Sequence, residues 1–481
     1  MKIEQFVIEG LGHQSYCILD SESGTAAVVD PRRDVDVYLQ AAQRAQARIT
    51  HILETHIHND YITGSRELVA RTGATIYASA IDPLHYEHQP VREGDRFPVG
   101  SLSFTALATP GHTPEHVSYL LHEPGKEAPT ALFSGGSLLA ANAGRTDLLG
   151  KEMMLTLTRQ QYHTLRRLLD TLPGQVRVYP THGAGSFCMS TSSDSARSTT
   201  IAQERLVNPA AVAKDEGEFV QRQIAGYSEY PSYYRYMGPT NKEGPRILGA
   251  IPTPPPLSPQ EVQERMRSGV PLVDGRWRET FAREHVPGSL NIELDSSFST
   301  YVGWTLPFNV PIMILIEDED GRREAVVQLI RIGYERVEGY VDGGIQAWKA
   351  AALPTGQFSS MDIETLYKRW SPRSCREPFV VLDVRRSDEW RDGHIPGALH
   401  VHVGDLAQRM DELPKDQPIV TLCRTGHRAE IAASMIAATG REVIAVREGM
   451  EEWIKRGWPS SASRDGSAAP VAQQDHTHAH P

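Results

Sequence analysis

The chain has 481 residues, 40% of them apolar, which is enough for about three domains with buried cores. Its formal net charge of -11 argues against nucleic acid as the main partner, and no apolar run approaches the ~20 residues of a membrane-spanning helix. The first residues are typical of a strand rather than of a secretion signal, and four scattered cysteines are too few for a disulfide framework. We therefore expect a cytoplasmic protein that is bound neither to nucleic acid nor to a membrane.

Short β-rich runs alternate with helical patterns over residues 1 to about 185. The early pattern predicts strands at 16–19, 26–30, 49–53 and 75–78 and helices at 38–47 and 65–72. Later apolar runs predict strands at 102–107, 117–121, 131–133 and 176–179. Several of these strands end in polar, glycine-containing loops, which is where a rigid scaffold usually carries its functional residues.

The loop after the predicted strand at 49–53 carries two imidazoles and a carboxylate. His56, His58 and Asp60 lie within five residues of one another. A cluster at the C-terminal edge of a sheet lies where open α/β folds bind ligands. Imidazole and carboxylate together suit a borderline or hard divalent metal. The sequence therefore predicts a metal site at this edge.

Two later loops supply further histidines. Residues 109–116 read TPGHTPEH and contain His112, and residues 179–183 read YPTHG and contain His182. This order of HxHxD, GHTPEH and THG resembles the metallo-β-lactamase fold. The segment Gly-Arg-Thr-Asp at 144–147 narrows the resemblance to its persulfide dioxygenase-like branch. The resemblance implies an α/β domain built as an αββα sandwich, which we place with a helical extension at residues 1–255.

The resemblance also implies a ligand set. His56, His58 and His112 match the family's first metal site, whereas Asp60 and His182 match part of its second site. Related persulfide dioxygenases hold one non-haem iron with two histidines and one aspartate, a facial triad that suits O₂ activation.

Two positions depart from the family pattern. Tyr61 replaces the last histidine of the first motif, and Gly136 stands where the family has its aspartate ligand. Three interpretations remain: His58 completes a three-histidine site, Asp60 supplies the missing carboxylate, or the site has lost its metal. We favour one retained metal ion, Fe²⁺ with Zn²⁺ as the alternative, because five ligand-type residues occupy matching loop positions.

Three further residues near these loops invite a role. Arg145 and Asp147 either orient the substrate and the ligands or form a structural salt bridge. Cys188 follows His182 by six residues and is a weaker candidate for a catalytic thiol.

Beyond a proline-rich spacer at 252–256 the chain repeats itself. The segments 272–276, 285–290 and 343–348 match 382–385, 394–399 and 448–453. Both copies resemble rhodanese domains, which implies two small doubly wound α/β domains at 256–356 and 357–460. The remaining tail, 461–481, is rich in Ser, Ala and Gln, contains histidines near its end, and is predicted to be disordered.

The second copy carries the clearest single site of the sequence. Cys423 lies between a predicted strand at 419–422 and a predicted helix at 429–439. Backbone N–H groups at such a junction favour a thiolate and a bound anion. The segment matches the six-residue rhodanese active loop, so we expect Cys423 to accept sulfur with help from the loop residues Arg424, Thr425, Gly426, His427 and Arg428.

The first copy lacks this chemistry. Aligning Pro311 with Pro418 puts Ile316 at the Cys423 position, followed by four consecutive acidic residues. A missing thiol and a run of carboxylates are the reverse of an anion cradle. We therefore predict that the first copy is inactive in sulfur transfer and serves as a structural or docking module.

The two resemblances together imply an enzyme of sulfur metabolism. The first domain would oxidise a small thiol persulfide to sulfite with O₂, and Cys423 would link persulfide, sulfite and thiosulfate. The alternatives are a sulfurtransferase with a non-oxidising first domain, a zinc-dependent thioester hydrolase, or a sulfur carrier or sensor. The inactive repeat and the long connecting segment favour a homodimer.

Overall fold

The computed structural model describes residues 1–189, 196–371 and 378–461. The chain forms two compact units, Met1–Gly356 and Gln357–Pro481, and the first unit contains both predicted segments 1–255 and 256–356. From residue 462 onward, the tail predicted to be disordered lies outside the described residues. No helix of the described ranges is long and apolar enough to cross a membrane.

Two six-stranded sheets build the N-terminal part of the first unit. The first sheet has the order β1 (Lys2–Ile8), β2 (His13–Asp20), β3 (Thr25–Val29), β4 (Arg48–Leu53), β5 (Thr75–Ser79) and β6 (Gln89–Val91). The second has the order β14 (Thr199–Thr200), β13 (Arg177–Pro180), β10 (Ala131–Gly135), β9 (Val117–His122), β8 (Leu102–Ala108) and β7 (Arg96–Val99). A two-stranded ribbon of β11 (Leu138–Leu139) and β12 (Asn142–Ala143) follows β10.

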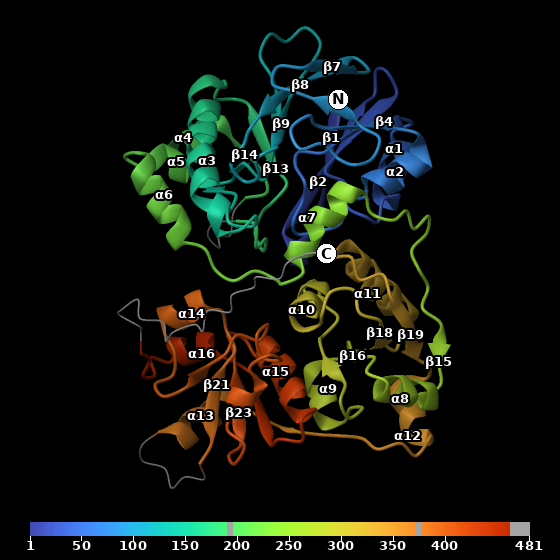
Figure 1. Ribbon diagram of the computed structural model, residues 1–481, viewed down its shortest axis with the longest axis vertical. Coiled ribbons are helices and arrows are strands. Elements are labelled where there is room, and N and C mark those ends of the chain that lie inside the picture. The colour runs from blue at the N-terminus through green and yellow to red at the C-terminus, as the bar shows by residue number, and fades with distance from the viewer. Residues whose placement is uncertain (190–195, 372–377, 462–481) are drawn as a thin grey trace. The chain divides into compact units, whose positions relative to one another are not determined.

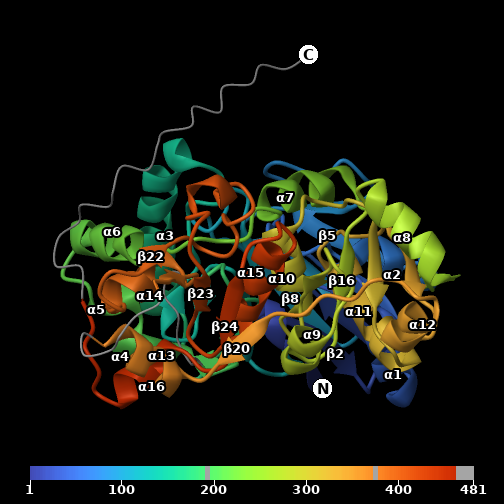
Figure 2. The same ribbon diagram turned by 90° about the horizontal axis from the view of Figure 1, so that it is seen from below.

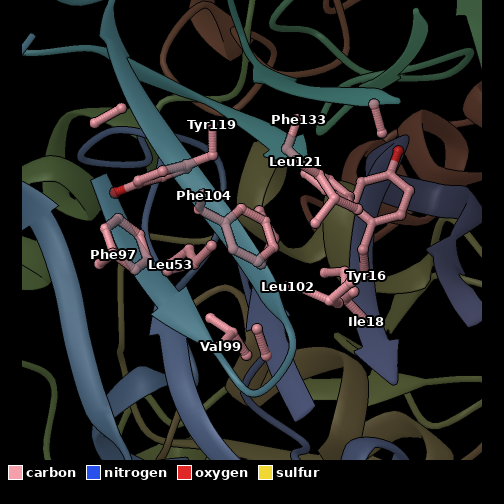
Figure 3. Packing of buried hydrophobic residues seen from close by; sticks show 14 of the residues in the cluster. Tyr16, Ile18, Leu53, Phe97, Val99, Leu102, Phe104, Tyr119, Leu121 and Phe133 are labelled. Atoms are coloured by element: carbon pink, nitrogen blue, oxygen red, sulfur yellow. The ribbon is translucent and has the colours of Figure 1, made fainter. Parts of the chain in front are cut away.

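An apolar core fills the space between the two sheets (Figure 3). Tyr16 and Ile18 from β2 contribute to the same cluster as Phe104, Tyr119 and Phe133 from the second sheet. Alternate residues of a strand point to one face, so β2 and β8 each present every second side chain to this core.

Helices cover the outer faces of both sheets (Figure 1). Residues of α1 (Asp36–Arg44) and α2 (Ser65–Thr72) pack in one cluster with residues of the first sheet. A second cluster joins the second sheet to α3 (Lys151–Thr171), α4 (Ile201–Val207), α5 (Pro209–Val212) and α6 (Glu216–Ala225). The expected αββα sandwich is therefore confirmed. The helix predicted at 38–47 ends earlier, at Arg44, and Gln46 has a positive φ of 52°.

Two five-stranded parallel sheets follow α7 (Tyr234–Glu243) in the chain, one in each compact unit. The first consists of β15 (Pro256–Leu257), β19 (Val337–Val341), β18 (Ile312–Leu315), β16 (Leu272–Asp274) and β17 (Leu290–Asn291). Its helices are α8 (Pro259–Arg267), α9 (Arg278–Arg283), α10 (Phe298–Thr305), α11 (Glu319–Arg331) and α12 (Gly344–Ala350).

The second sheet has the same topology, with β20 (Ser359–Met361), β24 (Val443–Val446), β23 (Ile419–Leu422), β21 (Val380–Asp383) and β22 (Leu399–His400) in that order (Figure 2). Its helices are α13 (Ile363–Trp370), α14 (Ser387–Asp392), α15 (His427–Ala437) and α16 (Met450–Lys455). In both copies an aspartate ends the strand that comes second along the chain, β16 or β21. It pairs with an arginine two residues later, Asp274 with Arg276 and Asp383 with Arg385. The predicted pair of doubly wound α/β domains is therefore confirmed.

Candidate metal centre and sulfur-transfer loop

Three loops at strand ends bring the predicted ligands together. The loop after β4 carries His56, His58 and Asp60, the loop after β8 carries His112, and the loop after β13 carries His182. All five side chains are buried. The loops at the strand ends therefore bring histidines from distant parts of the chain together at one edge of the sandwich.

His56, His112 and His182 offer one ligand atom each within 4.8 Å of one another. The Nε2 atoms of His56 and His182 are 3.4 Å apart. Burial, followed by the neighbouring imidazoles, lowers the pKa of His56 well below its usual range and the pKa of His112 to about 3. These two rings are therefore neutral at pH 7 and have a lone pair to give to a metal.

Two of the three rings are held by hydrogen bonds at Nδ1, and the third has a carboxylate near its Nδ1 atom. Thr55 Oγ1 lies 2.8 Å from Nδ1 of His56, and the backbone carbonyl of Arg145 accepts a 2.7 Å hydrogen bond from Nδ1 of His112. Asp60 Oδ2 lies 3.3 Å from Nδ1 of His182. Metal-binding histidines are commonly oriented in this way by a carboxylate or a carbonyl.

The buried Nε2 atom of His112 tests whether these residues fit a metal. Within the described ranges this nitrogen has no hydrogen-bond partner. A buried polar atom without a partner is costly, and a metal ligand is one explanation for it. Three imidazoles with oriented Nδ1 atoms therefore fit a single divalent metal ion.

His58 lies elsewhere than the sequence led us to expect. Its Nε2 atom is 3.2 Å from Glu54 Oε2 and 3.3 Å from Asp30 Oδ1. Burial alone would lower the pKa of His58, but Asp30 and Glu54 outweigh burial and raise it to about 10. A protonated imidazole is a poor metal ligand. The structure therefore groups His182 with His56 and His112, whereas His58 falls in two other groups, one with Asp60 and His182 and one with Asp30 and Glu54.

Gly136 follows β10 and touches the centre without supplying a ligand. Its N–H donates a 3.0 Å hydrogen bond to Nε2 of His116. A Cβ atom at this position would lie 2.2 Å from Cδ2 and 2.6 Å from Nε2 of His112. The imidazole of His112 therefore occupies the space into which a side chain at position 136 would extend.

Asp60 is a buried carboxylate beside His182. Burial would raise its pKa, but His182 and His58 outweigh burial and hold the pKa of Asp60 well below its usual range. Tyr61 is buried, and its hydroxyl donates a 3.2 Å hydrogen bond to the backbone carbonyl of Asp30. The carboxylate thus orients His182, and the tyrosine is a packing residue.

The side chain of Arg145 makes contacts with several segments of the chain. Its guanidinium forms a two-pronged ion pair with Asp147 at 2.7 and 2.8 Å and donates to the carbonyls of Phe187 and Ser228 at 2.9 Å each. The ring of Tyr230 stacks on it, with the ring centroid 4.6 Å from Cζ. This side chain therefore ties the helical extension to the sandwich, and only its carbonyl contacts the metal loops.

Cys188 is buried beside Arg145. Burial, and then the charge of Asp60, raises the pKa of its thiol well above the usual range. A buried thiol that stays protonated is a poor nucleophile. The placement of Cys188 therefore favours packing over catalysis.

Cys423 directly follows β23, at the junction that leads into α15. Its Sγ atom accepts a hydrogen bond from the N–H of Gly426, with 3.1 Å between sulfur and nitrogen. Gly426 takes a positive φ of 95°, which only glycine adopts at little cost, and forms the N-cap of α15. The start of the helix therefore points at the sulfur and favours negative charge there.

The two loop arginines lie in ion pairs. Arg428 makes a two-pronged pair with Glu389 of α14, at 2.5 and 2.8 Å, so it braces the loop against a neighbouring helix. Arg424 is 65% exposed, and its Nε atom lies 3.2 Å from Glu451. Thr425 is exposed and His427 is half-buried. Arg424 is thus the more exposed of the two loop arginines.

The first copy has the same junction with different contents. Ile316 directly follows β18, as Cys423 follows β23, and is buried. Asp318 caps α11 by accepting the N–H of Gly321 over 2.6 Å. A carboxylate therefore occupies the helix start that in the second copy faces the thiol.

Some residues of the site escaped sequence reasoning. Glu54 precedes the metal motif and His116 ends the GHTPEH segment, so their closeness to the predicted ligands was a usable signal. Asn241 lies in α7 and its amide hydrogen-bonds to the backbone of the metal loop. Nothing in its sequence context indicates this contact.

Comparison with known protein families agrees with this architecture. The metallo-beta-lactamase superfamily matches residues 10–182, and the rhodanese-like domain matches residues 258–351 and 370–456. "Persulfide dioxygenase ETHE1, mitochondrial" from Homo sapiens is 30% identical over 217 residues, which cover 43% of this chain and 74% of that protein.

Two further relatives match the first domain, and the match of the second one extends beyond it. "Hydroxyacylglutathione hydrolase" from Pseudomonas putida is 33% identical over 167 residues, or 35% of this chain and 60% of that protein. The crystal structure of a metallo-beta-lactamase from Staphylococcus aureus subsp. aureus COL has a TM-score of 0.63 and 28% sequence identity, and the match covers 70% of this chain and 98% of that chain. These relatives show that the chain is similar to enzymes.

Proposed function

This chain belongs to the metallo-β-lactamase superfamily, as a homologue of persulfide dioxygenase fused to two rhodanese-like domains, and we propose that it both oxidises and transfers sulfane sulfur. Its first domain would oxidise a small thiol persulfide to sulfite with O₂ at a single Fe²⁺ ion. Its second rhodanese copy would carry sulfur as a persulfide on Cys423.

The observation that carries the proposal is the hydrogen bond from the N–H of Gly426 to the sulfur of Cys423. The thiolate of Cys423 attacks the outer sulfur of thiosulfate, a new S–S bond forms, and sulfite leaves with the electron pair of the broken bond. The anionic persulfide then lies at the start of α15, where N–H groups stabilise it. In the reverse direction, sulfite takes the outer sulfur and thiosulfate leaves.

The first domain contributes binding and orientation. His56, His112 and His182 would hold the metal through ring nitrogens, while Asp60 and the carbonyl of Arg145 keep two of these rings in place. When bound, Fe²⁺ supplies the redox chemistry that O₂ requires. The buried site excludes bulk water from the reacting sulfur.

A zinc-dependent thioester hydrolase is the second candidate for the first domain. The donor set favours it, because a group of three histidines resembles a catalytic zinc site more than a facial triad of iron. The similarity to hydroxyacylglutathione hydrolase also supports it.

Oxygen uptake with glutathione persulfide, beside a metal assay, separates the candidates. The proposal expects about one iron per chain, oxygen uptake that His112→Ala abolishes, and uptake that survives Cys423→Ser. It also expects that thiosulfate–cyanide turnover is lost in Cys423→Ser and kept in His112→Ala. Stoichiometric iron without oxygen uptake would leave only a sulfurtransferase, and zinc with thioester cleavage would establish the hydrolase.

A further inference from the structure

The loop that carries Asp60 is held from outside the sandwich. Asn241 of α7 is only 2% exposed, and its Nδ2 atom donates to the carbonyls of His58 and Tyr61 at 2.8 Å each. Its Oδ1 atom accepts the N–H of Thr63 over 3.0 Å. One amide group therefore fixes both ends of the loop that includes Asp60.

The first rhodanese copy holds the same loop from another side. The N–H of Ile62 donates a 2.7 Å hydrogen bond to the carbonyl of Arg331, the last residue of α11. The guanidinium of Arg331 makes a buried, two-pronged ion pair with Asp34, at 2.7 and 2.8 Å, which fixes α11 to the sandwich. Figure 1 shows α7 and α11 where the sandwich meets the first rhodanese copy, within the first unit.

These anchors converge on the metal centre. Tyr233, which caps α7, donates its hydroxyl to the carbonyl of Asp60 over 3.2 Å. The carboxylate of Asp60 in turn lies 3.3 Å from Nδ1 of His182. A shift of the anchored loop would therefore move Asp60 and turn the imidazole of His182.

We propose that α7 and the first rhodanese copy form a positioning module for the metal centre, with Asn241 and Arg331 as its positioning residues. The proposal rests on the metal centre of the proposed function but on no particular reaction there. It gives the first rhodanese copy, which has no thiol at the Cys423 position, a role in its own chain. This copy supplies the backbone carbonyl, that of Arg331, which accepts the N–H of Ile62 in the metal loop.

Metal affinity tests the proposal independently of turnover. Co²⁺ alone is titrated into the full-length chain against a chelator, and its visible spectrum reports the coordination geometry. We expect Asn241→Ala to raise the dissociation constant by about tenfold, the lower end of what an outer contact is worth, because it acts on His182 only through the loop and Asp60, and to change the spectrum. We expect Arg331→Lys, which keeps the charge but loses the two-pronged geometry, to act in the same direction.

Asn208→Ala is the matched control. Asn208 is also buried, and its Nδ2 donates to the carbonyl of Asn142 over 2.9 Å, but it caps α5 rather than the metal loop. It should lower the melting temperature while leaving the dissociation constant unchanged.

Two results with the variants would overturn the proposal: wild-type affinity in Asn241→Ala, or an equal loss of affinity in Asn208→Ala. If Asn241→Ala does not fold, Arg331→Lys decides by the same measurement. A wild-type chain that binds Co²⁺ but consumes no oxygen with iron refutes the proposed oxidation and leaves this inference standing. A wild-type chain that binds no metal refutes both.

Discussion

Restoring the family's aspartate at position 136 should weaken metal binding rather than improve it. A Cβ atom on Gly136 would lie 2.2 Å from Cδ2 of His112, where an ordinary contact begins at 3.4 Å. The imidazole of His112 would therefore have to move by about 1.2 Å, the difference between these two distances. Its Nδ1 atom, bonded to the carbonyl of Arg145 over 2.7 Å, resists such a move.

The size of this displacement decides the outcome. Metal–ligand distances tolerate changes of only about 0.2 Å, so a shift of about 1.2 Å removes His112 from the coordination sphere. Both Gly136→Ala and Gly136→Asp should then weaken metal binding by at least about 100-fold, because the loss of a ligand costs more than the 10- to 100-fold that an outer contact is worth. Overpacking should also cost about 1–3 kcal/mol of folding free energy.

Chelator competition with Fe²⁺ and Zn²⁺ on the full-length chain measures the effect. Gly174→Ala is the control, because a Cβ atom there lies no closer than 3.2 Å to any neighbour, Ala202 being the nearest. Tighter Fe²⁺ binding by Gly136→Asp than by the wild type would refute the reasoning, because it would mean that His112 yields its space at little cost.

Three further predictions concern other parts of the site. Asp60→Asn should weaken metal binding by about 10- to 100-fold, because His182 loses its charged partner. An unchanged dissociation constant in the same chelator assay would contradict this. The ionised carboxylate of Glu389 should stabilise the second unit by on the order of 3 kcal/mol at neutral pH, because burial would raise its pKa but Arg428 and Arg386 together outweigh burial and lower the pKa from 4.5 to about 2. A depressed carboxyl pKa stabilises above the unfolded value, so the advantage of the wild type over Glu389→Gln in denaturant unfolding should shrink as pH falls from 4.5 towards 2, and a pH-independent difference would count against it. Ile316→Cys should give no thiosulfate turnover in a chain that also carries Cys423→Ser, because a capping carboxylate already occupies that helix start; measurable turnover would show that the missing thiol is the sole defect.

Much of the fold followed from local patterns. Strands ending in polar loops predicted that the residues around His56, His112 and His182 would meet, because strand ends gather at sheet edges. The repeat was equally readable: aligning Pro311 with Pro418 puts β18 and β23 in register over their full lengths. Periodicity and motif order carry this information within a short stretch of sequence.

The choice among the histidines did not follow from local patterns. His58 and His182 are equally good ligands by type, and what separates them is that Asp30 and Glu54 face Nε2 of His58. Asp30 lies in another loop, so its contact with His58 depends on how β3 and β4 pair. Sequence spacing alone cannot give the side-chain direction that brings a carboxylate within 3.3 Å.

The role of Asn241 was out of reach for a similar reason. The sequence favoured packing of a helical extension for this region, and α7 does pack there. However, three hydrogen bonds connect the Asn241 amide to residues about 180 positions earlier in the chain. A single buried amide has no periodicity and no motif, so only the folded chain reveals its partners.

The two rhodanese copies use opposite ends of equivalent helices. In the second copy the start of α15 faces the thiol of Cys423, and the position equivalent to Arg331 is Ala438 at the other end of that helix. In the first copy the start of α11 is capped by its own aspartate, and Arg331 at its far end binds the sandwich. Because the first copy is attached through the C-terminal end of α11, its proposed role does not require an anion-binding loop at the start of that helix. The same fold would thus provide the proposed sulfur transfer at one helix end and the proposed mount for the metal loop at the other.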